Sequence, residues 1–450
     1  MMSQPVVELQ LDGLVGPTHY FGGLSVGNRA SMAHAGWQSH PRQAARQGLA
    51  KMRQVLALGL PQAVLPPLAR PAVDFLRQAG FRGGETDVLA QAAASAPYLV
   101  HLAMSSAFMW AANAATVIPS CDSVDGRCHI VVANLLATPH RALEGPARAA
   151  MFRQLWRDPN LVVVHDPLPP NPALSDEGAA NHCRLTPAHA HCGWHLLVYS
   201  RASDLPRRDL PRVFPGRQSR EASLAVARLG QLLPDRAFLA RQHPRAIDAG
   251  AFHNDVVMVG TCDRLLVHEY ALVEQDMVLQ TLRHHLPTLR IFQVAQHDLS
   301  LRHAVRSYLF NSQLLGTGQG YVLLAPMQSS HGAAAQVIRR LLDDGFITRV
   351  IFQDLDQSMA GGGGPACLRL CLPLTPQEVT TLRPGIVLDE GKLQWLETWV
   401  DHYYRETLTP QDLADPTLLS ETQQALEALT QGLELDALYP FQQARPSTPR

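Results

Sequence analysis

The sequence predicts an α/β fold made of several small sheets or of one closed arrangement of strands. Short β-rich runs alternate with helical segments along the chain, and this alternation is typical of α/β architecture. Ten such runs are more than one modest open sheet would hold. No Gly/Ser-rich or charged linker divides the 450 residues, so the composition marks no domain boundary.

The expected strands are short apolar or alternating runs, and the expected helices carry apolar residues at helical spacing. Strands are predicted over residues 6–11, 129–135, 161–165, 195–199, 255–260, 264–268, 290–295, 320–325, 349–353 and 366–372. Helices are predicted over residues 41–59, 218–232, 269–286, 298–315, 332–345, 393–406 and 418–433. The first of these helices ends at a glycine, which is a common helix stop.

Charge and composition exclude several classes of protein. With 46% hydrophobic and 17% charged residues, the chain is expected to be globular and not disordered. The 38 basic and 39 acidic residues nearly cancel, which argues against nucleic-acid or membrane partners recruited by bulk positive charge. Residues 88–121 lack charged side chains, but polar residues and a proline interrupt the run, so buried structure is expected there instead of a membrane helix.

The cysteines predict a reducing, cytoplasmic location. Seven cysteines are an odd number, and no C-x-x-C pair occurs. The opening segment MMSQPVVELQLDG has no basic region and no long apolar region, so no secretory signal is expected. The closing segment QQARPSTPR is expected to be a frayed polar tail.

The segment GGGGPACLRLCL (361–372) is the first candidate for chemistry. Its alternation predicts a strand with Cys367, Arg369 and Cys371 on one face, so Cys367 would begin a strand beside a glycine loop and a cation. A nearby cation favours the nucleophilic thiolate, whereas a small buried cysteine is the alternative interpretation. The glycines also fit G-x-G-x-x-A, but a dinucleotide-binding motif opens a helix, and this segment has strand periodicity.

Two further segments carry acid–base groups. In AFHNDVVMVG, His253 and Asp255 are two residues apart at the expected start of a strand, so they point the same way on an extended backbone. A loop histidine beside a capping aspartate is the alternative. In SDEGAANH, Asp176 and Glu177 precede a turn of small residues, and acidic residues that complement a helix N-terminus are the plainer explanation.

Two other motifs indicate different chemistry. GLSVG fits the G-x-S-x-G nucleophile elbow around Ser25, but no clear strand precedes it, and a flexible loop that wraps a ligand with backbone N–H groups fits better. Histidines and cysteines crowd residues 182–195, yet their spacing matches no standard zinc finger and H-E-x-x-H is absent, so no metal is expected. The crowded residues are His182, Cys183, His189, His191, Cys192 and His195.

Several longer strings occur in order along nearly the whole chain. They are LDGLVGPTHYFGGLSVGNRAS (11–31), SSAFMWAANAAT (105–116), VANLLATPHRALE (132–144), DEGAANHCR (176–184), GRQSREAS (216–223), FHNDV (252–256), YLFNSQLL (308–315), GGGPACLRL (362–370) and DALYPFQ (436–442). Together they resemble the N-succinylarginine dihydrolases, a family of guanidine-modifying enzymes. Strings of this length are far more specific than the short motifs above.

The resemblance implies a pentein-type α/β-propeller with approximate fivefold pseudosymmetry. This fold would form a single closed domain over residues 1–440, followed by a flexible tail over residues 441–450. The implied reaction takes N-succinyl-L-arginine and two waters to N-succinyl-L-ornithine, two ammonia and carbon dioxide, in arginine catabolism by the succinyltransferase pathway. A small-molecule substrate and a homodimer are expected, with no cofactor, no metal, no nucleic acid and no membrane.

The resemblance also assigns roles to residues. The nucleophile is Cys367, the general acid/base is His253 and the orienting carboxylate is Glu177. The implied substrate contacts are Gly22, Gly23, Leu24, Ser25, Val26, Gly27, Asn28, Arg29, Ala30, Ser31, Asn113, His140, Arg141, Arg217, Asp255 and Gly361. The family usually has asparagine where this chain has Gly361, so a contact made by that side chain would be lost or would pass to backbone or water.

The implied chemistry needs a strong nucleophile, because delocalised charge makes a guanidinium carbon a poor electrophile. A thiolate suits this task. Asp255 would accept N–H bonds from the guanidinium, and the neutral amide of Asn113 would help to hold the uncharged ureido group after the first hydrolysis. Four rival functions stay open: a serine hydrolase acting through Ser25, a zinc hydrolase, an amino-acid-binding protein without catalysis, and a deiminase that releases one ammonia.

Overall fold

The computed structural model describes residues 6–187 and 192–443, which form an α/β structure around five small sheets. Each sheet has three strands. The sheets are β15–β1–β2 (Arg369–Leu374, Val7–Gly13, Gln62–Leu65), β3–β4–β5 (Ala115–Ile118, Cys128–Val132, Val162–His165), β6–β7–β8 (His182–Leu185, Trp194–Tyr199, Ala237–Arg241), β9–β10–β11 (Met258–Thr261, Arg264–His268, Arg290–Val294) and β12–β13–β14 (Gln313–Thr317, Gly320–Pro326, Arg349–Gln353).

All five sheets share one topology. The middle strand runs antiparallel to one neighbour and parallel to the other. In the first sheet, Leu11 of β1 pairs with Leu370 of β15 and with Ala63 of β2. This sheet therefore joins an early strand to the last strand and closes the fold. The repetition confirms the α/β class and agrees with the fivefold arrangement that the resemblance implies.

Helices connect and cover the sheets. They are α1 (Arg29–Ala33), α2 (Pro41–Ala57), α3 (Val73–Gln78), α4 (Glu85–Ser95), α5 (Pro97–Met104), α6 (Gly145–Leu155), α7 (Arg220–Leu229), α8 (Pro244–Ala249), α9 (Gln275–His285), α10 (Leu301–Ser307), α11 (Gly332–Asp343), α12 (Asp356–Gly361), α13 (Pro376–Thr380), α14 (Glu390–Tyr403), α15 (Pro416–Gly432) and α16 (Pro440–Gln443). Parallel neighbours need a crossover connection, and α2, α6, α7, α9 and α11 lie in the five crossovers.

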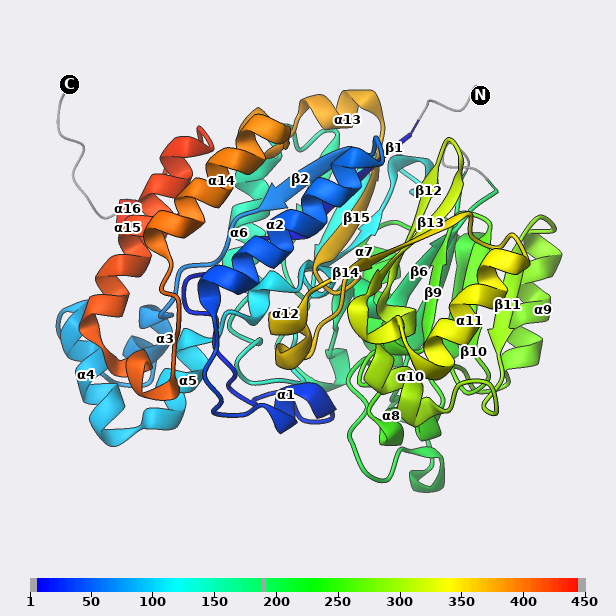
Figure 1. Ribbon diagram of the computed structural model, residues 1–450, viewed down its shortest axis with the longest axis horizontal. Helices are drawn as coiled ribbons and strands as arrows, with labels where there is room; N and C mark the ends of the chain where they lie inside the picture. Colours follow the sequence, from blue (N-terminus) through cyan, green and yellow to red (C-terminus); the bar gives the residue numbers. More distant parts are fainter. Residues whose placement is uncertain (1–5, 188–191, 444–450) are drawn as a thin grey trace.

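Helix α2 shows how local sequence builds this frame. Pro41 occupies its first position, where a missing N–H costs no intrahelical bond. Buried Ala45, Leu49 and Met52 recur at helical spacing and join the core that also holds residues of β1 and β15. The chain leaves the helix at Gly59, which has a φ of +76°. In Figure 1, α2 crosses the sheet of β15, β1 and β2, with α14 alongside it.

The predicted elements agree best with the structure at the sheet centres. All five middle strands, β1, β4, β7, β10 and β13, lie within predicted strands to within two residues. Five outer strands, β2, β3, β6, β8 and β12, are absent from the prediction, and each has only four or five residues. The predicted helix over 298–315 is wrong at its end, because Tyr308 takes a φ of +52° after α10 and residues 313–317 form β12.

Three further observations concern the whole chain. Of the predicted tail, residues 444–450 lie outside the described residues, while Pro440–Gln443 forms α16. No helix among the described residues is both long enough and apolar enough to cross a membrane. All seven cysteines are free thiols.

Candidate active site

Five short turns lie close together. Each precedes the outer strand that runs antiparallel to the middle strand of its sheet. They are η2 (Ala111–Asn113) before β3, η5 (Gly178–Asn181) before β6, η8 (Asn254–Val256) before β9, η9 (Leu309–Asn311) before β12, and the turn over 365–368 before β15. Each turn contacts the next, and the last returns to the first through the bond from the Ala112 N–H to the Cys367 carbonyl, 3.1 Å. We call this closed set the turn ring.

His253 and Glu177 form a buried pair at the turn ring. The His253 Nε2 lies 2.6 Å from the Glu177 Oε2, and the two residues are 2% and 0% exposed. Burial lowers the pKa of His253 to about 4, although Glu177 opposes the shift. Burial alone would raise the pKa of Glu177, but the His253 hydrogen bond and the nearby cations bring it below its ordinary value. The pair is therefore a neutral imidazole that donates to a carboxylate.

The second ring nitrogen of His253 is available to accept a proton. Its Nδ1 is buried and has no hydrogen-bond partner among the described residues. With Nε2 carrying the proton toward Glu177, Nδ1 has a lone pair that can accept a proton. The geometry is that of a general base oriented by a carboxylate.

Cys367 lies against Asp255 in the same ring. Its Sγ donates to the Asp255 Oδ2 over 3.7 Å, and the cysteine is 3% exposed. Burial, and then the charge of Asp255, raise the pKa of Cys367 well above its ordinary value. Burial raises the pKa of Asp255 to about 7. The unliganded site therefore holds a protonated thiol, and a bound cation would favour thiolate and carboxylate together.

Asn113 and Arg141 form a hydrogen-bond network that joins Glu177 to Glu144. The Asn113 Nδ2 donates to the Glu177 carbonyl over 2.8 Å, and its Oδ1 accepts from the Arg141 guanidinium over 2.7 Å. Arg141 also binds both carboxylate oxygens of Glu144, at 3.1 and 3.0 Å. Both ends of the Asn113 amide are thus used within the protein, so contact with a ligand requires one of these bonds to be exchanged.

Arg217 connects the predicted substrate loop to the pair formed by His253 and Glu177. Its Nη2 donates to the Ser25 hydroxyl over 2.9 Å and to the Val26 carbonyl over 2.6 Å. Its Nη1 lies 3.8 Å from the Glu177 carboxylate. The guanidinium also stacks over the Phe252 ring, 4.8 Å from its centroid. A single buried cation therefore faces both the loop and the Glu177 carboxylate.

The loop over residues 22–31 is fastened to the cysteine loop through Asn28. The Asn28 Oδ1 caps α1 by accepting from the Ser31 N–H, and its Nδ2 donates to the Gly362 carbonyl over 2.8 Å. Not every loop side chain faces the site. Val26 is 55% exposed, and Arg29 donates to the Ala249 carbonyl over 2.7 Å.

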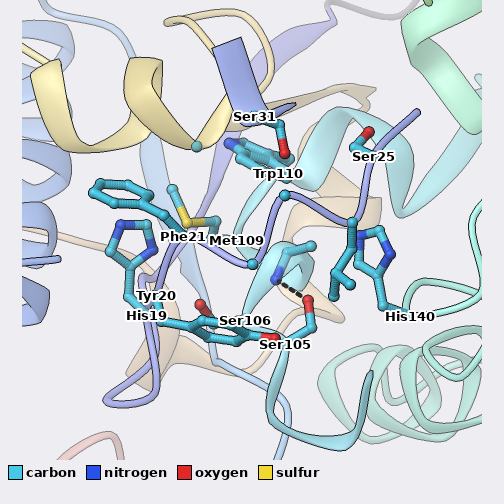
Figure 2. Close-up of a pocket in the computed structure, with 15 residues that line it drawn as sticks. His19, Tyr20, Phe21, Ser25, Ser31, Ser105, Ser106, Met109, Trp110 and His140 are labelled. Carbon is cyan, nitrogen blue, oxygen red and sulfur yellow. Dashed lines mark hydrogen bonds between the residues drawn. The ribbon is translucent and has the colours of Figure 1, made fainter. Parts of the chain in front are cut away.

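A small cavity of about 30 Å³ lies under this loop (Figure 2). Its predicted lining residues are Gly22, Gly23, Leu24, Ser25, Ser31, His140 and Gly361. Burial lowers the pKa of His140 well below its usual range, and its Nδ1 has no hydrogen-bond partner in the described chain. Gly361 also borders this cavity, and a Cβ there would lie 3.3 Å from the Trp110 ring. The family's asparagine would therefore sit beside Trp110.

Several residues of the site escaped the sequence analysis. His19, Tyr20, Ser105, Ser106 and Trp110 also line the cavity shown in Figure 2, together with Phe21, Ala107 and Met109. Tyr308 donates to the Gly362 carbonyl over 3.0 Å, and the Asn311 Oδ1 accepts from the Cys367 N–H over 3.3 Å. The signal was present, since these residues fall in or next to the strings that carry the family resemblance, but no short motif singles them out.

Two local expectations about the catalytic segments are wrong. Cys367 does not begin a strand, because residues 365–368 form a turn and β15 starts at Arg369. The cation that lowers the pKa of Cys367 is accordingly Arg141 and not Arg369. His253 and Asp255 do not share an extended backbone, because Asn254–Val256 forms η8 and β9 starts only at Met258. These side chains therefore reach the turn ring from tight turns and not from extended strands.

The rival motifs lead to other structures. Residues 21–25 form no strand, so no nucleophile elbow exists around Ser25. His182 is bonded to His195 over 2.8 Å, and His195 is bonded to Asp122 over 2.9 Å. His189 and His191 lie outside the described residues. Within residues 6–187 and 192–443, no three His, Cys, Asp or Glu side chains gather in a way that could hold a metal ion.

Solved structures of low sequence identity share this fold. The apo arginine dihydrolase ArgZ, from the ornithine–ammonia cycle in cyanobacteria, aligns with a TM-score of 0.52 and 14% identity over 82% of this chain and 42% of that chain. The N-terminal domain of ArgZ bound to product aligns with a TM-score of 0.50 and 14% identity, over 81% of this chain and 97% of that chain. These matches support the pentein-type fold.

Sequence similarity is much higher to proteins named N-succinylarginine dihydrolase. The protein of Chromohalobacter salexigens is 46% identical over 446 residues, covering 98% of this chain and 100% of the relative. The protein of Nitrosospira multiformis is 45% identical over 97% of this chain and 99% of the relative. A family profile described as succinylarginine dihydrolase also matches residues 5–442. The chain therefore belongs to the succinylarginine dihydrolase family.

Proposed function

We propose that this protein hydrolyses N-succinyl-L-arginine with two waters to N-succinyl-L-ornithine, two ammonia and carbon dioxide, as a step of arginine catabolism. Family membership supports the substrate. The observation that carries the proposal is the turn ring, which holds a buried thiol beside the half-buried carboxylate of Asp255 and a buried imidazole beside the buried carboxylate of Glu177.

The first cycle begins when Asp255 accepts N–H bonds from the substrate guanidinium. The positive charge of the substrate favours the Cys367 thiolate, and the thiol proton passes to the Nδ1 of His253. The sulfur attacks the guanidinium carbon, His253 returns the proton to the leaving nitrogen, and ammonia departs. Water, deprotonated by His253, then attacks the S-linked carbon, and release of the thiol leaves a ureido product.

The second cycle repeats this chemistry on the ureido group. Cys367 displaces the remaining terminal nitrogen as ammonia, and water releases a carbamate that decomposes to the free amine and carbon dioxide. Asn113 is proposed to hold the neutral group, where a second carboxylate would favour only a cation. Arg141, Arg217 and His140 are proposed to bind the substrate's carboxylates, because guanidinium forks fit them, while the loop over residues 22–31 and Gly361 would enclose the succinyl end.

Ammonia stoichiometry tests the proposal. With succinylarginine we expect two ammonia per ornithine product and no turnover of free arginine. One ammonia per substrate would instead indicate a deiminase, and binding without ammonia would indicate a non-catalytic protein. Cys367→Ala should abolish turnover while Ser25→Ala should retain it, and the reverse outcome would indicate a serine hydrolase. Activity that is lost to a chelator would indicate a zinc hydrolase.

We also propose a homodimer in the cytoplasm. The family resemblance supports the dimer, and the seven unpaired thiols are those of a protein kept in a reducing compartment. The nearly balanced charge gives no basis for nucleic-acid or membrane partners. Sedimentation of the purified protein at a mass near 49.3 kDa, that of one chain, would contradict the dimer.

A further inference from the structure

A buried amide in the fourth turn has no part in the mechanism above. Asn311 is 0% exposed and closes η9 directly before β12. Its carbonyl accepts from the Ala366 N–H over 2.9 Å, and its Oδ1 accepts from the Cys367 N–H over 3.3 Å. Both bonds hold the backbone of the cysteine turn and leave the sulfur free.

The donor end of the same amide is unpaired. The Asn311 Nδ2 is buried without a hydrogen-bond partner among the described residues, and so is the Asp255 Oδ1. Asn311 also lowers the pKa of both Asp255 and Cys367, against the larger effect of burial. A buried N–H donor without a well-formed hydrogen bond costs free energy, so its presence within reach of two groups that gain negative charge points to a role.

The neighbouring turns use amides in a related way. In the first turn, the Asn113 Nδ2 donates to the Glu177 carbonyl over 2.8 Å. In the second turn, the Asn181 Oδ1 accepts from the Asn254 N–H over 2.9 Å, between His253 and Asp255. An amide from one turn thus fixes the backbone of each turn that carries a catalytic group. The Asn181 Nδ2 is also buried without a partner among the described residues. Asn311 differs because its side chain interacts with both Asp255 and Cys367 and opposes the rise of their pKa values.

We propose that Asn311 is a positioning residue for Cys367, which fixes the cysteine turn with its oxygen and stabilises the negative charge on Cys367 and Asp255 with its nitrogen. The inference rests on the proposed function, since it assumes that Cys367 is the nucleophile. In the reaction, the amide would hold the sulfur against the substrate carbon while the charge moves between thiolate and thiol.

The test measures the thiol directly, without substrate. Cys367 alkylation by iodoacetamide is followed across a range of pH, with the Cys367 peptide quantified by mass spectrometry, because six other cysteines are present. Asn311→Leu, of similar size, removes the donor without adding charge. We expect its alkylation profile to move up by about one pH unit, which is roughly a tenfold slower reaction at fixed pH below the midpoint.

Two further variants separate positioning from general disruption. Asn311→Asp keeps the acceptor for the Cys367 N–H and should shift the profile further. Asn181→Asp makes the same chemical change in the second turn and should shift it less. A folded Asn311→Leu protein with the wild-type profile would overturn the proposal. If this variant does not fold, Asn311→Ala, which also lacks the donor, takes its place with the same two outcomes.

Kinetics give an independent readout. The folded Asn311 variants should lose about tenfold or more in kcat with little change in KM, because the thiolate matters for the chemical step. A raised KM with unchanged kcat would contradict positioning of the nucleophile. If wild-type protein turned over no succinylarginine, the proposed function would fail, whereas the alkylation result would still judge the role of Asn311.

Discussion

At the scale of single residues, burial outweighs the charged neighbours in setting the pKa values of His253 and Cys367. His253 stays neutral beside a carboxylate, because its loss of hydration outweighs the attraction of Glu177. Cys367 stays protonated for the same reason, and the adjacent Asp255 adds to the effect. In the proposed mechanism, the free protein therefore keeps the Cys367 thiol protonated, and a cationic substrate would supply the charge that favours its thiolate.

The pKa values predict which group limits activity at low pH. Asp255, with a pKa of about 7, must be ionised to receive the guanidinium, whereas His253, with a pKa of about 4, is already neutral. We expect kcat/KM to rise with pH through about 7 and then to level. An initial-rate profile checks this, since kcat/KM reports the free enzyme. Asp255→Asn should lower activity and abolish the rise of kcat/KM with pH. A rise of kcat/KM centred near pH 4 would contradict the assignment of this ionisation to Asp255.

For single residues, sequence patterns identify which side chains are reactive, but they do not predict the backbone conformation around them. Cys367, His253 and Asp255 stand in short motifs, so they can be singled out, but the motifs predict extended strands where the structure has turns. Glu177 is assigned only by the family resemblance, because an acidic string before a turn has a plainer explanation. Asn311 stays hidden, because one amide in an apolar string has no motif of its own.

Among the elements, predictability follows the length and clarity of the apolar run more than burial, since β2 and β3 are buried throughout and yet are absent from the prediction. The middle strands are predicted because each is covered on its two faces, so each contains a run of apolar residues; β4, for example, is buried throughout. The outer strands are short and more irregular. Strand β8 is mostly half-buried, and β6 carries a histidine and an arginine, so neither has a clear period. Long-range pairing with the middle strand makes them strands, and a local pattern cannot reveal that.

The loop over residues 22–31 is the element whose attachment should control substrate entry. The loop forms one wall of the small cavity together with His140 and Gly361, so a change in how the loop is held should change how substrate binds there. Asn28→Asp keeps the acceptor that caps α1 but replaces the donor to Gly362 with a repelling oxygen. We expect KM for succinylarginine to rise about tenfold with a smaller change in kcat.

A matched control shows whether the donor matters. Asn171 also caps a short helix, by accepting from the Ala173 N–H over 2.9 Å, and it is exposed. Asn171→Asp makes the same chemical change there, so it should leave KM as in the wild type. Equal KM values for Asn28→Asp and the wild type would show that the bond to Gly362 does not hold the loop.

At the scale of the whole molecule, the candidate site forms only because the fold closes on itself. The turn ring runs from Asn113 to Cys367 along the chain, and each turn comes from a different sheet. The last turn is held by β15, which pairs with β1 over six residues. No turn could gather the catalytic groups alone, which explains why the sequence predicts the residues but not their arrangement.

The same burial predicts how stability depends on pH. Burial lowers the pKa of many histidines, to about 4 for His19, His165 and His253. These groups bind protons in the unfolded chain from about pH 6.5 downward, but in the folded protein only near 4. Their stabilisation is therefore complete above about 6.5 and is lost as the pH falls through this window. Asp176 and Asp255, whose pKa values burial raises to about 6 and about 7, act in the opposite direction.

Because the lowered histidines outnumber these two carboxylates, we expect the free energy of unfolding to fall between about pH 6.5 and about pH 4. Each extra proton bound by the unfolded chain contributes about 1.4 kcal/mol per pH unit. Urea unfolding at several pH values measures this slope. His165 lies outside the turn ring and is half-buried against His129. His165→Gln should make the free energy of unfolding depend less steeply on pH. If the stability of the wild type is constant or rises as the pH falls, the raised carboxylates dominate and the prediction is wrong.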